Sequence, residues 1–144
     1  MANIIKRIIT VRTSVNAQVE TVWKHWTSPE SVKEWNNASD DWHTPKASND
    51  LRKGGKFSYR MEARDGSMGF DFEGVYNNVI VNKQIDYTMD DGRKVKITFS
   101  SEGQNTDIIE TFEAEDNHSI DLQRNGWQAI LDNFKKFAEL NKNA

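Results

Sequence analysis

Glu110 is the residue of this sequence with the clearest capacity for chemistry. It lies between Ile108 and Phe112 at a spacing of two, so these three side chains share one face of a β-strand. If that face is buried, loss of solvation raises the pKa of the Glu110 carboxyl toward the range of a general acid or base. The alternative buries Ile109 and Thr111 and leaves Glu110 in water. For an inward Glu110, we expect ligand binding or structural hydrogen bonding ahead of catalysis.

The other polar side chains form no catalytic or metal-binding pattern. His25, His43 and His118 fall in a helical segment, an edge segment and a loop, without the spacing of metal ligands. Gly54-Gly55 lacks the rest of a phosphate-binding loop, and no nucleophile-elbow motif occurs. The sequence contains no Cys, which excludes disulfides and thiolate metal sites. We therefore expect no metal and no cofactor.

Composition suggests one domain that contains unusually large apolar side chains. The chain has 144 residues and a formal net charge of -3, and we expect residues 1–144 to form a single domain. No basic stripe suited to nucleic acid is visible, and no segment reads as a signal peptide or a membrane span. These features favour a cytoplasmic protein. Five Trp, seven Phe and three Tyr accompany a mean hydropathy of -0.80, so the rings either fill a modest core or line a partly empty cavity.

The first third of the chain predicts a strand followed by two short helices. Apolar side chains alternate over residues 5–15, which is typical of a strand with one buried face. Asn16 is then expected to cap a helix over 19–26. Ser28 and Pro29 are expected to start a second helix as N-cap and first helical residue, and that helix runs to Trp35.

The middle of the chain predicts an antiparallel meander. The signals Asp65-Gly66 and Asp91-Gly92 are typical of hairpin turns, and the alternation is disturbed past Asn77-Asn78, which suggests a bulge. Pro45 places the first strand of this region at a sheet edge. The expected strands cover residues 42–51, 57–64, 70–81, 85–89, 95–99 and 106–113.

A long amphipathic helix is predicted over residues 117–141, with an apolar stripe at three- and four-residue spacing that comprises Trp127, Ile130, Leu131, Phe134, Phe137 and Ala138. At 1.5 Å per residue it is roughly 35 Å long. The sheet and the helix each have one face to bury. We therefore expect an α+β helix-grip fold, in which a curved antiparallel sheet wraps around the long C-terminal helix and two short N-terminal helices seal one end.

This order of elements resembles the START-like and birch-pollen-allergen-like (SRPBCC) superfamily, and within it the activator of Hsp90 ATPase homologue family. The motifs that carry the resemblance are Val22-Trp23, Thr27 with Pro29, Val32 with Trp35, residues 50–57, residues 72–76, Thr106 with residues 110–112, and residues 123–136. The resemblance implies a pocket between sheet and helix that takes apolar or amphipathic small molecules. It also implies two other possibilities, a co-chaperone module and a cyclase- or hydrolase-type enzyme.

The predicted site consists of rings with a few polar groups among them. Tyr59, Tyr76, Tyr87 and Glu110 would orient a ligand, because convergent polar groups set specificity in apolar pockets. The candidate ligand-binding residues are Trp35, Phe57, Tyr59, Phe70, Phe72, Tyr76, Tyr87, Phe99, Glu110, Phe112, Trp127 and Phe134.

The leading hypothesis is a binding protein for an apolar or amphipathic small molecule. The alternatives are a protein-interaction module related to Hsp90 co-chaperones, with a chaperone as partner, and a cyclase- or hydrolase-type enzyme that uses Glu110. No nucleic acid partner and no membrane span are expected. Whether the protein is a monomer or a homodimer stays open.

Overall fold

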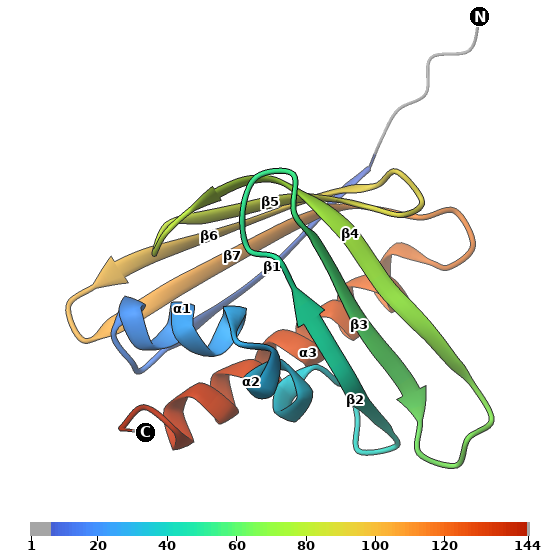
Figure 1. Cartoon of the computed structure of the whole chain (residues 1–144), viewed down its shortest axis with the longest axis horizontal. Helices are drawn as coiled ribbons and strands as arrows, with labels where there is room; N and C mark the ends of the chain where they lie inside the picture. Colours follow the sequence, from blue (N-terminus) through green and yellow to red (C-terminus); the bar gives the residue numbers. More distant parts are fainter. Residues whose placement is uncertain (1–6, 144) are drawn as a thin grey trace, which may run out of the picture.

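An antiparallel sheet of seven strands curves around the C-terminal helix in the computed structural model of the chain, which describes residues 7–143 (Figure 1). The strands are β1 (Ile8–Val15), β2 (Trp42–Asn49), β3 (Lys56–Ala63), β4 (Gly69–Ile80), β5 (Gln84–Met89), β6 (Lys94–Glu102) and β7 (Asn105–Glu113). Their spatial order is β1-β7-β6-β5-β4-β3-β2. The predicted meander and the helix-grip fold class are confirmed. Ile5, the predicted start of the first strand, lies outside the described residues.

Two kinds of irregularity shape the sheet, and both follow from local sequence. Gly66 and Gly92 adopt positive φ angles of 77° and 90° in the β3–β4 and β5–β6 hairpins, a conformation that glycine adopts without steric cost. The register of β4 against β5 shifts between Tyr76 and Asn78, so the predicted bulge is confirmed. A second shift, beside Pro45 in β2, reflects the donor that proline lacks.

The three helices are α1 (Val19–Thr27), α2 (Pro29–Trp35) and α3 (Ile120–Leu140). The prediction that Asn16 caps α1 is wrong. Gln18 is the N-cap residue and makes no side-chain capping bond, while the backbone N–H of Asn16 donates to Glu139 Oε2. Pro29 does open α2 after Ser28, but the Ser28 side chain makes no capping bond either.

The long helix begins three residues later than predicted. The hydroxyl of Ser119 accepts a hydrogen bond from the backbone N–H of Leu122 at 3.0 Å, which defines the N-cap. His118 precedes the helix, with an exposed side chain whose Nδ1 lies 2.8 Å from Glu115 Oε1.

One ring joins the three helices. Phe134 of α3 is fully buried, and its ring centroid lies 4.8 Å from that of Trp26 on α1 and 4.9 Å from that of Trp35 on α2. The indole N–H of Trp35 donates to the backbone oxygen of His25 at 3.0 Å. The helix–helix contacts therefore consist largely of edge-to-face ring packing, which orients the rings as well as burying them.

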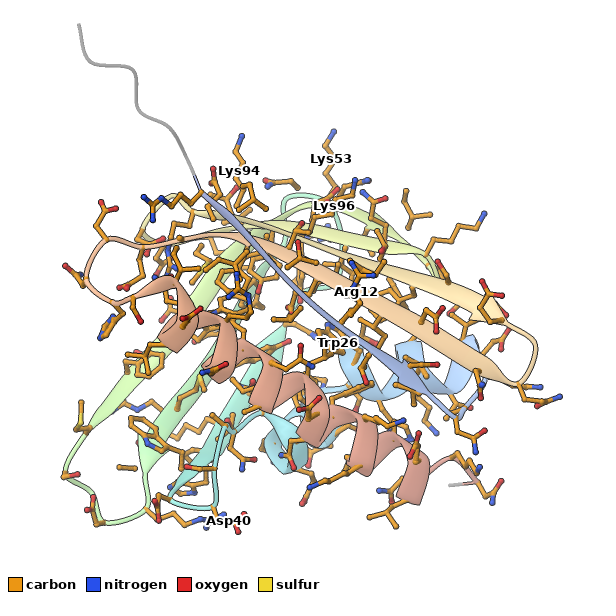
Figure 2. All side chains as sticks on the ribbon, turned by 180° about the vertical axis from the view of Figure 1, so that it is seen from behind. Arg12, Trp26, Asp40, Lys53, Lys94 and Lys96 are labelled. Atoms are coloured by element: carbon orange, nitrogen blue, oxygen red, sulfur yellow. The ribbon has the colours of Figure 1, made fainter. Side chains whose placement is uncertain are left out.

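The free edge of β1 is covered by side chains of α3. The Gln128 side chain bonds both the N–H and the C=O of Arg12, and Lys135 Nζ donates to the backbone oxygen of Ser14. Figure 2 views the molecule from behind, with Arg12 on β1 close to α3. An edge strand normally exposes such groups to other chains, and here α3 satisfies those of Arg12 and the carbonyl of Ser14 within the molecule.

Phe134→Ala should lower the free energy of unfolding by about 3–5 kcal/mol, because it removes a fully buried ring from the junction of three helices. Leu140→Ala, at a position on α3 that is 85% exposed, should change it by less than about 0.5 kcal/mol. Urea unfolding followed by circular dichroism measures both. Equal stabilities for the two variants would contradict the role given to Phe134.

Candidate functional site

A cavity of about 400 Å³ lies between the concave face of the sheet and α3. This volume falls within the range of small-molecule sites in proteins. Strands β3 to β7 and all three helices contribute to its wall. Most of the residues predicted to form the site line it: Trp35, Phe57, Tyr59, Phe70, Phe72, Tyr76, Tyr87, Glu110 and Trp127.

Three predicted lining residues lie in the core instead of the cavity wall. Phe99 packs edge-on against Trp23, with ring centroids 5.3 Å apart. The ring of Phe112 is stacked against that of Trp127, with centroids 3.8 Å apart and an interplanar angle of 11°, and Phe134 is enclosed by the short helices. Alternation along a strand identifies the inward face, but it does not indicate which inward rings the helix covers directly.

Several lining residues were missing from the predicted site, although the sequence held a signal for some. Met61 and Met89 continue the alternation of Tyr59 and Tyr87, and Ile130 belongs to the apolar stripe of the long helix. Other unforeseen lining residues are Trp26, Thr27, Asn36, Asp71, Glu73, Ile85, Asp90, Asp91, Arg93 and Ile97. Thr27, Asn36, Asp90, Asp91 and Arg93 lie at helix ends or in the β5–β6 turn, where periodicity carries no information on direction.

Glu110 points inward, which settles the open choice of face. On β7 it pairs with Val11 of β1 and Ile97 of β6. The residue is 6% exposed and borders the cavity. Within residues 7–143, no hydrogen bond or ion pair reaches its carboxyl group. A carboxyl in such surroundings loses solvation without compensation, and burial raises the pKa of Glu110 to about 8. The carboxyl is therefore mainly protonated at neutral pH.

Phenol groups form the polar part of the cavity wall on β3, β4 and β5. The rings of Tyr59, Tyr76 and Tyr87 surround Phe57 at centroid distances of 5.2, 5.3 and 4.8 Å. Gly74 permits this arrangement, because a Cβ there would lie 2.7 Å from the Phe57 ring. Burial is the main cause that raises the pKa of all three phenols, so they stay neutral and can both donate and accept hydrogen bonds.

Tyr87 is the phenol whose pKa depends on the charge of Glu110. Its pKa is raised well above the ordinary value, first by burial and then by the charge that Glu110 carries when ionised. The two groups lie on the same face of the sheet, on β5 and β7. Together they place an acid and a hydroxyl in the cavity wall.

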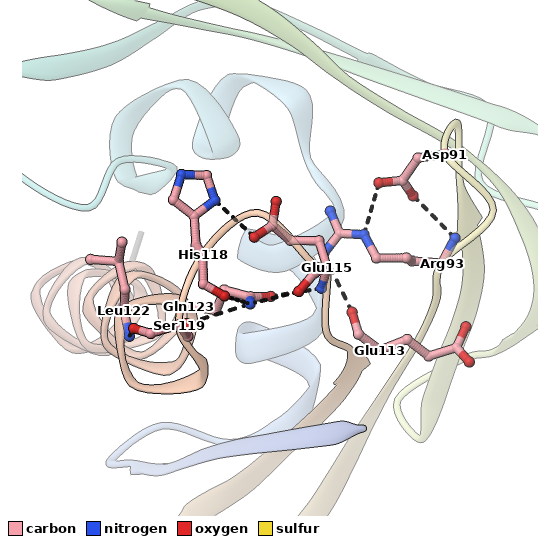
Figure 3. Close-up of polar contacts among 8 residues, drawn as sticks. All are labelled: Asp91, Arg93, Glu113, Glu115, His118, Ser119, Leu122 and Gln123. Carbon is pink, nitrogen blue, oxygen red and sulfur yellow. Dashed lines mark hydrogen bonds and ion pairs between the residues drawn. The ribbon is translucent and has the colours of Figure 1, made fainter. Parts of the chain in front are cut away.

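A hydrogen-bonded network ties the β5–β6 hairpin to the chain that leads into α3 (Figure 3). Arg93 Nε donates to Asp91 Oδ2 at 2.8 Å, and Arg93 Nη1 donates to the backbone oxygen of Glu113 at 3.3 Å. Gln123 of α3 accepts from the Glu115 N–H and donates back to the Glu115 carbonyl. The bonds to Asp91 and Glu113 hold the guanidinium of Arg93, a residue of the cavity wall, while those of Gln123 anchor the first turn of α3 to the preceding loop.

The histidines lie away from the cavity. His25 is buried, with its ring nitrogens 3.1 Å from Ser31 Oγ and from the backbone oxygen of Asn141. His43 approaches Glu62 at 3.8 Å on the β2–β3 surface. In the part of the chain that the structure describes, no group of three His, Asp or Glu side chains could hold a metal ion.

Glu110→Gln should stabilise the protein at alkaline pH. Since the folded pKa of Glu110 is about 8 and the unfolded value is about 4.3, the folded state binds more protons between these values. Wild-type stability should therefore lose up to about 1.4 kcal/mol for each pH unit gained across this window through this group. Urea unfolding at pH 5 to 8 gives the free energy of unfolding of both proteins. The difference between variant and wild type isolates the contribution of Glu110 ionisation. A difference that does not change with pH would contradict the buried, unpaired carboxyl.

Comparison with known proteins places the chain among others of the same architecture. The family described as activator of Hsp90 ATPase homolog 1-like protein matches residues 16–139. An AHSA1-like protein from Aeromonas hydrophila is 42% identical, with a TM-score of 0.88 and 94% of each chain covered. The protein Chr148 from Cytophaga hutchinsonii is 50% identical, with a TM-score of 0.80 and 92% of each chain covered.

More distant structures share the fold alone. CalU16 from Micromonospora echinospora is 19% identical, with a TM-score of 0.68, and the match covers 94% of this chain and 78% of that one. A search of curated proteins finds no match. No helix within residues 7–143 is long and apolar enough to cross a membrane. From the extent of the family match and the two close structures, the chain belongs to the family of activator of Hsp90 ATPase homolog 1-like proteins.

Proposed function

We propose that this protein binds an apolar or amphipathic small molecule in the cavity between the sheet and α3. The observation that carries the proposal is a cavity of about 400 Å³ whose wall is rich in aromatic rings and also contains the Glu110 carboxyl and three phenol groups. Apolar surface buried by a ligand contributes roughly 25 cal/mol per Å² before the costs of association. The polar groups would orient the ligand, while the rings would supply most of the affinity.

The ligand would enter beside β4. On the opposite side, α3 is bonded to the edge of β1, so that side is closed. Phe70 lines the cavity and is 46% exposed, which places cavity wall at the protein surface. The edge of the Phe72 ring meets Trp127 of α3 at a centroid distance of 6.1 Å. These two rings would separate the cavity from the surface and move apart for a ligand.

Two other functions have some support. An enzyme could use Glu110, because a carboxyl with a pKa of about 8 can transfer protons near neutral pH. A chaperone-binding module is suggested by the family description and by the exposed Ile80 and Val81 at the end of β4. We favour ligand binding, because it uses the whole cavity wall.

The absence of Cys suits a reducing cytoplasm, where we expect the protein to act.

Ile130→Trp should abolish ligand binding without unfolding the protein. Ile130 projects from α3 into the cavity and is half-buried, so a larger ring there would occupy ligand space. Native mass spectrometry of freshly purified protein, with extraction of anything bound, should find a small apolar molecule on wild type and none on the variant.

Leu122→Trp is the matched control, since Leu122 is on the same helix, is 57% exposed and lies outside the cavity wall. It should retain the bound molecule. The proposal fails if wild type carries nothing and takes up no apolar probe such as a fluorescent naphthalene sulfonate, or if Ile130→Trp binds as wild type does.

A further inference from the structure

We infer that the cavity takes an apolar amine, with its ammonium group against Glu110 and its hydrocarbon body along the rings of Phe72 and Trp127. The inference rests on the proposed binding function and specifies the chemical class of the ligand. Three features of the cavity support it: an inward carboxyl without a donor, an excess of acidic over basic residues along the wall, and several aromatic rings in the lining.

The first feature is the isolation of Glu110. It projects into the cavity from β7, between Val11 and Ile97, and neither neighbour can donate a hydrogen bond from its side chain. A buried polar group without a partner costs free energy that a suitable partner recovers. Because residues 7–143 supply none, a ligand that carries N–H donors would complete this part of the wall.

The second feature is the charge of the cavity wall. Asp91 and Arg93 form an ion pair at 2.8 Å, and Arg93 is the one cationic residue in the described cavity wall. Asp71 is paired with Arg60 at 3.3 Å. Four acidic residues besides Glu110 border the cavity: Asp90 and Asp91 lie in the β5–β6 turn, whereas Asp71 and Glu73 alternate with Phe70 and Phe72 on β4, so their side chains lie on the other face of that strand. An excess of one sign at the mouth of a cleft raises the local concentration of ligands with the opposite charge.

The positions of two lysines on the sheet keep positive charge away from the cavity. Lys94 and Lys96 of β6 are exposed and point away from the cavity, on the convex side of the sheet (Figure 2). For a fatty carboxylate the described wall offers one cationic residue, Arg93, which is already paired with Asp91. The distribution of charge therefore favours a cation over an anion.

The third feature is the number of aromatic rings in the lining. Trp26, Trp35, Phe72, Tyr87 and Trp127 all line the cavity. Ammonium groups are attracted to the faces of such rings, most strongly to Trp, and desolvation increases the attraction. A neutral alcohol could also donate to Glu110, but it would lack the attraction of a cation to the rings and to the acidic residues of the wall, so the amine is the better match.

Binding of the amine should be linked to the ionisation of Glu110. Without ligand the carboxyl is mainly protonated at neutral pH, because its pKa is about 8. An ammonium group binds the carboxylate form, so binding releases a proton and tightens as pH rises toward 8. The amine keeps its charge there, since alkylamines titrate near the pKa of lysine, about 10.4.

The groups around Glu110 should not add a pH dependence of their own to the binding of the amine. Tyr59 of β3, Tyr76 of β4 and Tyr87 of β5 remain neutral because their pKa values are raised. The remaining charged groups of the wall are Asp71, Glu73, Asp90, Asp91 and Arg93. The neighbours from β1, β6 and α3 are Val11, Ile97, Trp127 and Ile130, which do not titrate.

Decylamine, decanol and decanoate are matched probes for the test. Their dissociation constants for the ligand-free protein, below micelle-forming concentrations, can be measured by calorimetry from pH 6 to pH 8. Decylamine should bind at least about tenfold more tightly than decanol at pH 8, and its affinity should rise by up to about tenfold per pH unit below the pKa of Glu110. Decanol should show no such dependence.

Glu110→Gln should remove both the preference for decylamine and its dependence on pH. Asp107→Asn is the control, because Asp107 lies on the same strand, three residues away and on the other face; it should behave as wild type. If the Gln variant does not fold, the three wild-type pH profiles still decide between the ligand classes.

The outcomes separate this inference from the proposed function. If decanol or decanoate binds as tightly as decylamine, or if Glu110→Gln keeps the preference, the inference is overturned while binding in the cavity stands. If none of the three probes binds and no apolar molecule copurifies with wild type, the proposed function fails as well.

Discussion

The ring of Phe134 packs against both Trp26 and Trp35, which also contact each other, and through these rings α3 holds both short helices over one end of the sheet. Together with the hydrogen bonds from Gln128 and Lys135 to β1, this contact positions α3 over the sheet. On β7 the helix is close enough for Trp127 to stack on Phe112. Farther round the curve, on β3 to β5, the helix no longer covers the strands, and the space under it stays open. The cavity is therefore a consequence of packing a straight helix inside a curved sheet.

The same kind of side chain consequently has two roles in this molecule. Phe99 and Phe112 are covered and contribute to stability, whereas Phe72 and Trp127 meet only by an edge contact and border empty space. Composition could not separate these roles, because cores and pockets draw on the same residues. The distinction depends on the distance between helix and strand at each ring, which is a property of the assembled fold.

Much of the fold was predictable because its determinants are local. Hairpin glycines, alternating strands and the long apolar stripe led to the correct order of elements. The predictions failed or stayed open where the same residues allow more than one local structure. Asn16 could have capped a helix but bonds α3 instead. The face of Glu110 stayed open because Ile108 and Ile109 are adjacent, and only the pairing of β7 with β1 and β6 selects Ile108 for the core.

The closure of the β1 edge by Gln128 and Lys135 has a consequence for how the chain folds during synthesis. The partner of β1 is β7, on the order of a hundred residues later in the chain, and α3 is made after β7. A nascent chain therefore carries β1 without a partner on either edge until nearly every other element has left the ribosome. Exposed strand edges of this kind are prone to pair with other chains. The nascent chain is therefore vulnerable to aggregation from the synthesis of β1 until α3 is complete.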